Sequence, residues 1–347
     1  MRSENHLFRA AIIGAATLKG RELKDVLEER NFPAVDVRLL DDDESLGQLE
    51  RVQDEVSFIQ PVTADQLENI DFTFFASESD FTSKNWKMAR EAGSAVIDLS
   101  YALENDSAAL LGAPWIEREL GRQTHLNLDS NIVSIAHPAA VTLALLLLRA
   151  GRAAAIRRVV AAVFEPVSER GRRGMDELHE QTIKLLSFQQ MPKEVFDAQV
   201  AFNMLGQYGA SAKQSLELVE RRIGQHLRRL LGRDAPPLTL MLLQAPVFHA
   251  HTFAIHIELE KSLSPGDFSR AIAGDHVLIS RSPAEGPSNV NVAGKDDILV
   301  SLRRSASQEN ETGFWIWAAV DNLRLAAITA FECATALAAV RPHGKVQ

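Results

Sequence analysis

Short apolar runs alternate with helical segments over the first hundred residues, and this alternation constrains the fold more than any other feature. The apolar runs occupy residues 10–14, 35–40, 72–76 and 95–100. Between the first two runs, Leu23, Val26 and Leu27 recur at the spacing of a helix,. Buried strands that alternate with helices form βαβ units in a parallel sheet. We therefore predict an α/β fold whose N-terminal part is a Rossmann-like, doubly wound parallel sheet.

The rest of the 347-residue chain mixes the two patterns, and the chain is long enough for a second domain,. Strands are predicted at residues 157–167, 237–260 and 314–320, and helices at residues 175–186, 194–205, 215–231 and 323–340,. This mixture predicts a second domain of the α+β class.

Charge and composition restrict the possible partners. A net charge of −9 disfavours nucleic acids and anionic membranes,. The longest apolar run, residues 139–148, is too short to span a bilayer, and the N-terminus lacks a stretch of signal-peptide length,. The one cysteine, Cys333, excludes disulfide frameworks and is interpreted as a packing residue of the last helix,. We expect a soluble, cytoplasmic protein with neither a nucleic-acid nor a membrane partner.

The stretch G-A-A-T-L-K-G, residues 14–20, follows a predicted strand and opens a predicted helix. In that context the pyrophosphate of a dinucleotide binds backbone N–H groups at the helix start. Thr17 stands between Gly14 and Gly20, at the position where glycine lets the backbone approach the phosphate, so the pattern is degraded,. The turn is either a weakened NAD or NADP site or a plain strand-to-helix turn.

Four acidic residues, 41–44, follow the second predicted strand. In dinucleotide-binding folds an acidic side chain about 20 residues beyond the glycine turn accepts the ribose hydroxyls of NAD. Asp41 is the candidate for that role, and its charge repels the additional phosphate of NADP. The alternative is a solvated acidic loop. Both interpretations favour NAD over NADP.

Six short stretches, in their order and spacing, resemble the aspartate-semialdehyde dehydrogenases, and among them the bacterial homologues that lack the catalytic cysteine. They are V-L-E-E-R-N-F-P (26–33), A-G-S-A-V-I-D-L-S (92–100), M-D-E-L-H-E-Q-T (175–182), A-F-N-M-L (201–205), Q-A-P-V-F-H-A-H (244–251) and V-D-N-L-R (320–324). The resemblance covers residues 10–337. It implies a dinucleotide-binding domain at residues 1–130 plus 321–347, a dimerisation domain at residues 131–320, and a homodimer.

The family that the chain resembles converts an acyl phosphate through a cysteine thioester, with NADPH as hydride donor and a histidine that handles protons. Its nucleophile turn has the pattern N-P-N-C-[ST], and residues 137–141, H-P-A-A-V, align with it here. The resemblance thus places Ala140 at the nucleophile position, and a methyl group cannot attack a carbonyl carbon. His251 keeps the position of the base, and Glu165 replaces the glutamine beside the nucleophile.

The resemblance also marks four substrate-binding positions. Gln244 and Glu104 stand where family members have arginines for the substrate carboxylate and phosphate, and Glu220 and Arg324 occupy two further positions. A site for a doubly charged acyl phosphate needs cations or oriented donors. Neutral and acidic side chains replace two of those cations here, so the resemblance implies that the parent reaction is lost.

Histidines cluster near the base position. His249, His251 and His256 lie on one predicted strand, where His249 and His251 share a face because alternate side chains project together,. No carboxylate spacing completes a ligand set, so the clustering is interpreted as chance and no metal site is predicted. His137 is predicted to hydrogen-bond the backbone of its turn. The basic run R-G-R-R-G, residues 170–174, is either an anion site or a solvated loop.

Three functions remain open at this point. The first is a catalytically silent relative that acts through binding of an unknown small molecule or protein, and Ala140, Gln244 and Glu104 together favour it. The second is a remodelled dehydrogenase that uses NAD and His251 without covalent catalysis. The third is an active aspartate-semialdehyde dehydrogenase of amino-acid biosynthesis, which requires a nucleophile that the sequence does not supply.

Overall fold

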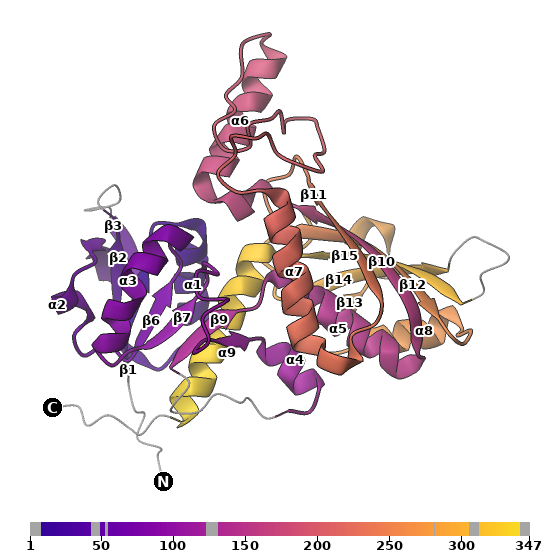
Figure 1. Cartoon of the computed structure of the whole chain (residues 1–347), viewed down its shortest axis with the longest axis horizontal. Coiled ribbons are helices and arrows are strands. Elements are labelled where there is room, and N and C mark those ends of the chain that lie inside the picture. The colour runs from indigo at the N-terminus through magenta and orange to yellow at the C-terminus, as the bar shows by residue number, and fades with distance from the viewer. Residues whose placement is uncertain are drawn as a thin grey trace. The chain divides into compact units, whose positions relative to one another are not determined.

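The computed structural model describes residues 8–42, 49–52, 55–122, 131–280, 282–304 and 312–340. The chain divides into two compact units, residues 1–136 with 326–347 and residues 137–325 (Figure 1). The second boundary falls inside the helix α9 (Asn322–Val340). The limits at residues 130 and 321 that the resemblance implies for the functional domains stay a prediction.

Among the described residues, the first unit is built on a seven-stranded sheet in the order β5-β2-β1-β6-β7-β9-β8, whose neighbouring strands all pair in parallel. Its strands are β1 (Phe8–Ile13), β2 (Ala34–Asp41), β5 (Gln60–Pro61), β6 (Phe72–Phe75), β7 (Ala95–Asp98), β8 (Leu110–Gly112) and β9 (Ile132–Ile135). The remaining elements are α1 (Leu18–Glu29), α2 (Ala64–Leu67), α3 (Ser79–Glu91), α4 (Pro114–Glu119) and the antiparallel pair β3 (Leu49–Val52) and β4 (Glu55–Phe58). This order confirms the predicted Rossmann-like sheet.

Aromatic rings and one helix face form the core of the first unit. Phe32, which follows α1, meets the rings of Phe72, Phe74 and Phe331 edge-on, with centroids 5.5 to 6.1 Å apart. The predicted core face of α1 is buried as well: Leu23, Val26 and Leu27. Each large apolar side chain contributes roughly 1.5–3 kcal/mol when it is fully buried. The helical spacing seen in the sequence therefore places α1 against the sheet.

The helix α9 is long and apolar enough, by length and composition alone, to cross a membrane. However, 61% of that apolar stretch is buried inside the protein. Cys333 and Leu337 are among its buried side chains. These properties are those of a core helix, and they agree with the closing helix predicted from the sequence.

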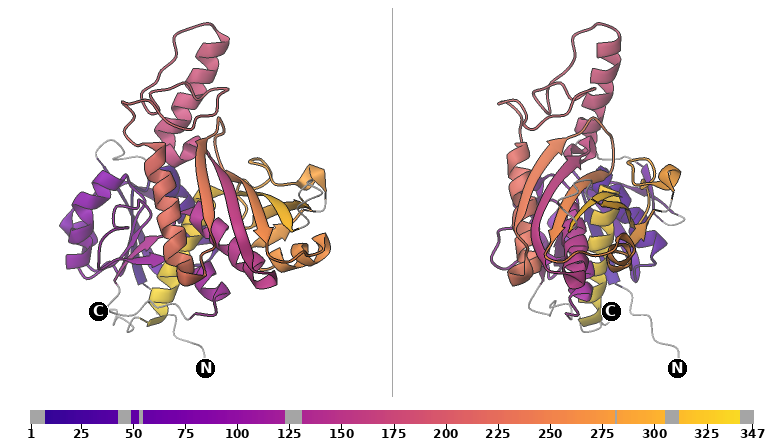
Figure 2. Two further views of the ribbon diagram at one scale, coloured as in Figure 1. Left: turned by 45° about the vertical axis from the view of Figure 1, so that its right-hand side comes forward. Right: turned by 90° about the vertical axis from the view of Figure 1, so that its right-hand side faces the viewer.

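In the described part of the second unit, a six-stranded mixed sheet has the order β11-β10-β12-β15-β14-β13. Its strands are β10 (Ile156–Glu165), β11 (Leu238–Gln244), β12 (His251–Leu259), β13 (Val277–Ile279), β14 (Ile298–Arg304) and β15 (Gly313–Val320). Its helices are α5 (Pro138–Ala153), α6 (Gly171–Leu186), α7 (Leu216–Leu231), α8 (Pro265–Ile272) and the short 3-10 turns η2 (Val167–Arg170), η3 (Gly232–Asp234) and η4 (Pro283–Glu285). The long helix α7 lies along α5, and α6 projects away from the sheet (Figure 2). This architecture confirms the predicted mixed domain.

The predicted helix at residues 194–205 is wrong, because the segment consists of turns, bends and irregular backbone. Side chains of α6 take the place of helical hydrogen bonds: Glu177 accepts the amides of Val195 and Phe196, at 2.5 and 3.4 Å. Gln181 accepts the amide of Val200 at 2.7 Å in the same way. Asp197, with a φ of 48°, has a left-handed conformation that a helix does not contain,. Long-range hydrogen bonds therefore override the local helical pattern here.

Candidate functional site

The helix α5 begins at the turn that the resemblance marks as the nucleophile turn. His137 is its N-cap, since its Nδ1 accepts the N–H of Ala139 at 3.2 Å, and the predicted backbone hydrogen bond is confirmed. Pro138 follows at the first helical position, where the missing N–H of proline is tolerated,. The side chain of Ala140, in the same first turn, is fully buried. A helix start lowers the pKa of a thiol, but this turn presents a methyl group.

The chain's one cysteine does not replace the missing nucleophile. Cys333 is fully buried in α9, in the part of the helix that belongs to the first unit. A Cβ atom at Gly112 of β8 would overlap its Sγ, so the thiol is tightly packed against the strand. Burial raises the pKa of the Cys333 thiol well above its ordinary value. A buried, protonated thiol is inert as a nucleophile.

Two histidines and a glutamate lie together in the second unit, at the start of α5. The rings of His137 and His251 have centroids 5.5 Å apart, and His251 Nε2 lies 4.0 Å from Glu169 Oε1. One nitrogen or oxygen atom from each residue lies within 4.8 Å of the other two. Burial lowers the pKa of His137 well below its ordinary value, although the charge of Glu169 opposes this effect. The ring of His137 is therefore neutral at neutral pH.

Asn322 positions two members of this cluster. Its Nδ2 donates to Glu169 Oε1 at 2.8 Å, and its Oδ1 accepts the amide of Ala250 at 3.0 Å. Ala250 has a φ of 74°, which is uncommon for a residue other than glycine, and it directly precedes His251,. Asn322 therefore fixes both the carboxylate of Glu169 and the chain geometry from which His251 projects.

A second buried network surrounds the position of the family's glutamine. Glu165 Oε1 forms an ion pair with Arg170 Nη2 at 2.6 Å, and both side chains are at least nine-tenths buried. Burial opposes the charge of Arg170, but Glu165, Tyr208 and Glu169 together outweigh this effect and raise the pKa of the guanidinium. Arg170 Nη2 also donates to the Tyr208 hydroxyl at 3.3 Å. Burial raises the pKa of Tyr208, so the phenol stays protonated.

Gln244 completes this network and is fully engaged within the protein. Its Oε1 accepts the Tyr208 hydroxyl at 2.5 Å, and its Nε2 donates to the backbone carbonyls of Glu165 and Ala245 at 2.8 and 2.9 Å. The side chain has no exposed surface. At this position the amide holds β10 and β11 together, whereas the family's arginine would present a charge to substrate.

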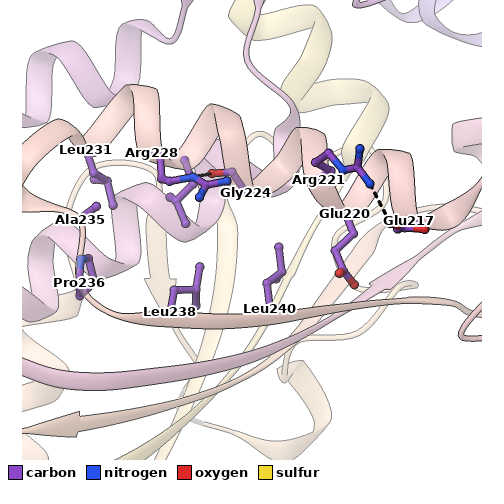
Figure 3. Close-up of a pocket in the computed structure, with 11 residues that line it drawn as sticks. Glu217, Glu220, Arg221, Gly224, Arg228, Leu231, Ala235, Pro236, Leu238 and Leu240 are labelled. Atoms are coloured by element: carbon purple, nitrogen blue, oxygen red, sulfur yellow. Dashed lines mark hydrogen bonds and ion pairs between the residues drawn. The ribbon is translucent and has the colours of Figure 1, made fainter.

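Glu220 lies in α7, at one end of a pocket of about 530 Å³ between α7 and β11 (Figure 3). Its Oε2 accepts the amide of Leu242 at 2.7 Å, so the carboxylate binds a backbone donor of β11. Arg221 also borders the pocket and pairs with Glu217 at 2.8 Å. The charged side chains at this end of the pocket are therefore engaged by other groups of the protein.

Arg324 and Glu104 belong to different units. Arg324 Nε donates to Asp296 Oδ1 at 2.7 Å, so an acidic neighbour in the second unit balances its charge. Glu104 lies half-buried in the first unit, in the turn that follows β7. The buried carboxylate of Asp98 holds this turn by accepting the amides of Ser100 and Leu103 at 2.7 and 2.9 Å.

The glycine turn of the first unit has the geometry of a strand-to-helix turn. Gly14 has a φ of 85°, and a Cβ atom there would overlap the backbone of Ser77. A Cβ atom at Gly20 would overlap the carbonyl oxygen of Gly14. Thr17 caps α1, because its Oγ1 accepts the amide of Gly20 at 3.0 Å and donates to the carbonyl of Gly14 at 2.8 Å. Close packing therefore requires both glycines, whether or not a phosphate binds.

The side chain of Asp41 points toward the glycine turn. Its Oδ2 accepts the amide of Ala16 at 2.8 Å, its Oδ1 accepts the amide of Asp42 at 2.9 Å, and the residue is 5% exposed. Burial raises the pKa of the carboxyl, and the two amides oppose that shift. The rest of the predicted ribose-reading loop, residues 43 and 44, lies outside the described residues.

A dinucleotide fits the described part of this unit. The first amides of α1, at Leu18 and Lys19, point out of the helix start, where a pyrophosphate would bind,. The Asp41 carboxylate stands next to the turn, with both oxygens bonded to backbone amides. Thr17 is the departure from the usual pattern.

Two interpretations from the sequence need correction. His249 and His251 do not share a strand face, because β12 begins at His251 and the left-handed Ala250 interrupts the alternation. The run of residues 170–174 is neither a solvated loop nor an anion site at Arg170, because that guanidinium is buried against Glu165 and the run forms the start of α6.

The sequence did not reveal the roles of Glu169, Tyr208 and Asn322, or the ion-pair role of Arg170. No metal-ligating set was predicted from it, whereas the fold brings His137, Glu169 and His251 together. The three ligand-type residues come from three separate segments, so no local spacing announces them. The nearest signal was a glutamate and an arginine in adjacent positions, 169 and 170, shortly after an apolar strand.

The sequence matches two family descriptions. Residues 9–124 match the NAD-binding domain of semialdehyde dehydrogenase, and residues 147–325 match its dimerisation domain. The aspartate-semialdehyde dehydrogenase of Rickettsia bellii is 29% identical over 324 residues, which cover 91% of this chain and 93% of that protein. The USG-1 protein homolog of Pseudomonas aeruginosa is 29% identical over 315 residues, which cover 90% of this chain and 92% of that protein.

A solved structure agrees with both units. The aspartate semialdehyde dehydrogenase II of Vibrio cholerae, complexed with ASA, has a TM-score of 0.82 at 25% identity, covering 96% of this chain and 98% of that chain. The resemblance found in the sequence is thereby confirmed. This chain belongs to the aspartate-semialdehyde dehydrogenase family, which includes USG-1 homologues.

Proposed function

We propose that this protein keeps the aspartate-semialdehyde dehydrogenase fold without catalysing the phosphorylating dehydrogenase reaction, and that it acts through binding. The observation that carries the proposal is Ala140, whose buried methyl group stands in the first turn of α5 at the aligned nucleophile position. Without a nucleophile no thioester forms, and the covalent route is closed. Cys333, buried and packed against β8, offers no substitute.

The charges around the site support the same proposal. A doubly charged acyl phosphate needs cations or oriented donors. Gln244 is neutral, and its amide is engaged by Tyr208 and by two backbone carbonyls. The cations of Arg170 and Arg324 are each paired with a carboxylate. The substitutions therefore affect the nucleophile and the anion-binding groups together.

Intact-protein mass spectrometry tests the missing covalent step. After incubation with aspartate semialdehyde and either dinucleotide, followed by acid quenching, the protein mass is expected to stay unchanged. An active aspartate-semialdehyde dehydrogenase treated in parallel serves as the positive control. An acyl adduct on this chain that hydroxylamine removes would contradict the proposal.

We propose further that the first unit binds a dinucleotide weakly and prefers NAD to NADP. The bond from the Ala16 amide to Asp41 Oδ2 supports this preference, because it holds a carboxylate beside the turn where the ribose would lie,. A bound nicotinamide dinucleotide supplies hydride transfer. Thr17 in place of the middle glycine accounts for the weaker affinity.

Substituting Asp41→Asn keeps an acceptor for the Ala16 amide and removes the charge. We expect the affinity for NADH to fall and that for NADPH to rise, each by up to about tenfold, since one charge contact near a protein surface is worth roughly 1–4 kcal/mol before solvent screening. Calorimetric titration of both proteins with the four dinucleotides measures this shift. Tighter binding of NADPH than of NADH by the wild-type protein would refute the NAD preference.

We propose a homodimer formed through the sheet face of the second unit that its helices leave uncovered. On that face the strand register aligns Met241, Ala162, Ala254 and Trp317 in one row, and Met241 and Trp317 are 53% and 40% exposed. Such exposed apolar rows mark interaction surfaces. Sedimentation equilibrium is expected to give twice the mass of the chain, and a monomer at micromolar concentration would argue against this interface.

Family membership also supports a cytoplasmic location.

The alternative function is a remodelled NAD(P)-dependent oxidoreductase that works without a covalent intermediate. One observation favours it: His251 Nε2 lies 4.0 Å from Glu169 Oε1, a distance that would have to shorten to about 3 Å for the carboxylate to orient the ring of a histidine base,. Reduction of an aldehyde that is lost in His251→Asn would favour this alternative over the silent relative. The third possibility, an active enzyme of amino-acid biosynthesis, would need a nucleophile, and the methyl group of Ala140 cannot serve as one.

A further inference from the structure

We propose that His137, Glu169 and His251 form a binding site for a divalent transition-metal ion of the zinc type. Each residue offers one ligand atom, and these atoms lie within 4.8 Å of one another. The His251 Nε2 to Glu169 Oε1 separation is 4.0 Å. Two imidazoles and one carboxylate are a ligand set that suits zinc and its neighbours in the first transition row. This site goes beyond the proposed loss of thioester chemistry and does not depend on it.

The geometry needs only a small contraction to accept the ion. Zinc binds histidine nitrogen and carboxylate oxygen at about 2.0–2.2 Å, so ligand atoms in a tetrahedral site stand roughly 3.4 Å apart. The His251–Glu169 separation exceeds that value by roughly 0.6 Å and no separation exceeds it by more than roughly 1.4 Å, which side-chain rotation can supply,. Three protein ligands leave a fourth position for water or another oxygen ligand, as in catalytic zinc sites.

Each ligand residue is held by a different element, so the cluster is partly preorganised. His137 is the N-cap of α5, Glu169 belongs to η2, and His251 opens β12. Asn322 donates to Glu169 Oε1 at 2.8 Å and also accepts the amide of Ala250, beside His251. Hydrogen bonds of this kind orient metal ligands and strengthen binding.

The hydrogen bonding of His137 suits a cation. Its Nδ1 accepts the amide of Ala139, which requires a lone pair on that nitrogen. A neutral imidazole can ligate without losing a net proton. Coordination through Nδ1 would replace a hydrogen bond of 3.2 Å, whereas coordination through Nε2 would move the ring proton to Nδ1,. Both routes weaken the contact with Ala139.

The charges around the cluster partly offset one another. The negative charge of Glu169 attracts a cation to the cluster. The positive charge of Arg222, and that of His226 when it is protonated, disfavours a positive charge at His137 and therefore opposes binding of the ion. Because the charge of Arg222 opposes the ion, we expect weaker binding than in structural zinc sites, with a Kd of about 1 µM,.

Titration of the chelator-treated full chain with Zn²⁺, against a competing chromophoric chelator, tests the proposal at pH 7.5. We expect one ion per chain and a Kd at or below about 1 µM. Glu169→Gln keeps an oxygen for Asn322, and His137→Asn keeps a good N-cap, so both variants should fold. Each should weaken binding at least about tenfold. His256→Asn, on the opposite face of the sheet from His251, is the matched control and should leave binding unchanged,.

A Co²⁺ absorption spectrum provides a second measurement that does not depend on the variants. Four-coordinate Co²⁺ with nitrogen and oxygen ligands, without a thiolate charge-transfer band, is the expected signature. Three outcomes would overturn the proposal: no Zn²⁺ binding by the wild-type chain, equal binding in Glu169→Gln and His137→Asn, or an equal loss in His256→Asn. Hydrogen exchange in β12 confirms that the variants are folded.

Discussion

Replacing Ala140 by cysteine is expected to leave the protein without measurable phosphate-dependent turnover of aspartate semialdehyde. The substitution restores the nucleophile at the first turn of α5 but not the anion-binding groups, because Gln244 stays neutral and engaged by Tyr208. Losing one preorganised transition-state donor costs about 10²–10³ in kcat, and a lost charged contact costs at least as much. We expect Ala140→Cys to remain at least about 10³-fold below an active relative in the same assay.

Thiol reactivity shows whether the failure lies in the nucleophile or in its surroundings. Ala144→Cys is the matched control, because Ala144 is equally buried one turn further along α5. If the thiol at position 140 is alkylated faster than that at position 144 while turnover stays absent, the anion site is the missing part. Robust phosphate-dependent turnover by Ala140→Cys alone would refute this account of the site.

Substituting Arg170→Met should destabilise the second unit by about 3–5 kcal/mol, the second large effect that we expect. The guanidinium neutralises Glu165, whose side chain has no exposed surface. Removing one partner of a buried ion pair leaves an uncompensated charge and costs about 3–5 kcal/mol. Urea unfolding measures the loss, and hydrogen exchange of the β10 amides localises it to the unit that contains Glu165.

Two further variants separate the buried charge from other effects. In Glu165→Gln/Arg170→Met no charge remains at the pair, so most of the lost stability should return. Arg172→Met removes a nearby guanidinium from the first turn of α6. Arg172 pairs with Asp176 at 3.1 Å, and both side chains are mostly exposed. Exposed pairs contribute about 0–1 kcal/mol. A similar loss in Arg172→Met and Arg170→Met would show that burial of Glu165 is not the cause.

Local sequence patterns predicted most of the fold. The spacing of Leu23, Val26 and Leu27 identified α1, and the alternation of apolar runs identified the parallel sheet, because both signals depend on near neighbours in the chain. The helix predicted at residues 194–205 is wrong because that segment depends on residues elsewhere in the chain. There Glu177 and Gln181 supply the hydrogen bonds from another helix. A pattern of local hydrophobicity contains no information about such partners.

The candidate site was predictable only where it coincides with an ordered family pattern. The resemblance assigned Ala140, Gln244 and His251 to family positions, so they were named from the sequence. Glu169 and Asn322 acquire their roles through contacts between residues 153 positions apart. Likewise, Asp41 was identified by its distance from the glycine turn, but its bond to the Ala16 amide became visible only in the fold.

The most direct test of the central claim is steady-state turnover of the wild-type protein with aspartate semialdehyde, inorganic phosphate and NADP or NAD. An active aspartate-semialdehyde dehydrogenase at the same concentration calibrates the assay. Because Ala140 cannot form a thioester, we expect dinucleotide reduction no faster than in the absence of protein. Phosphate-dependent reduction with a kcat of about 1 s⁻¹ or more, the range of ordinary enzymes, would contradict the claim that the reaction is lost.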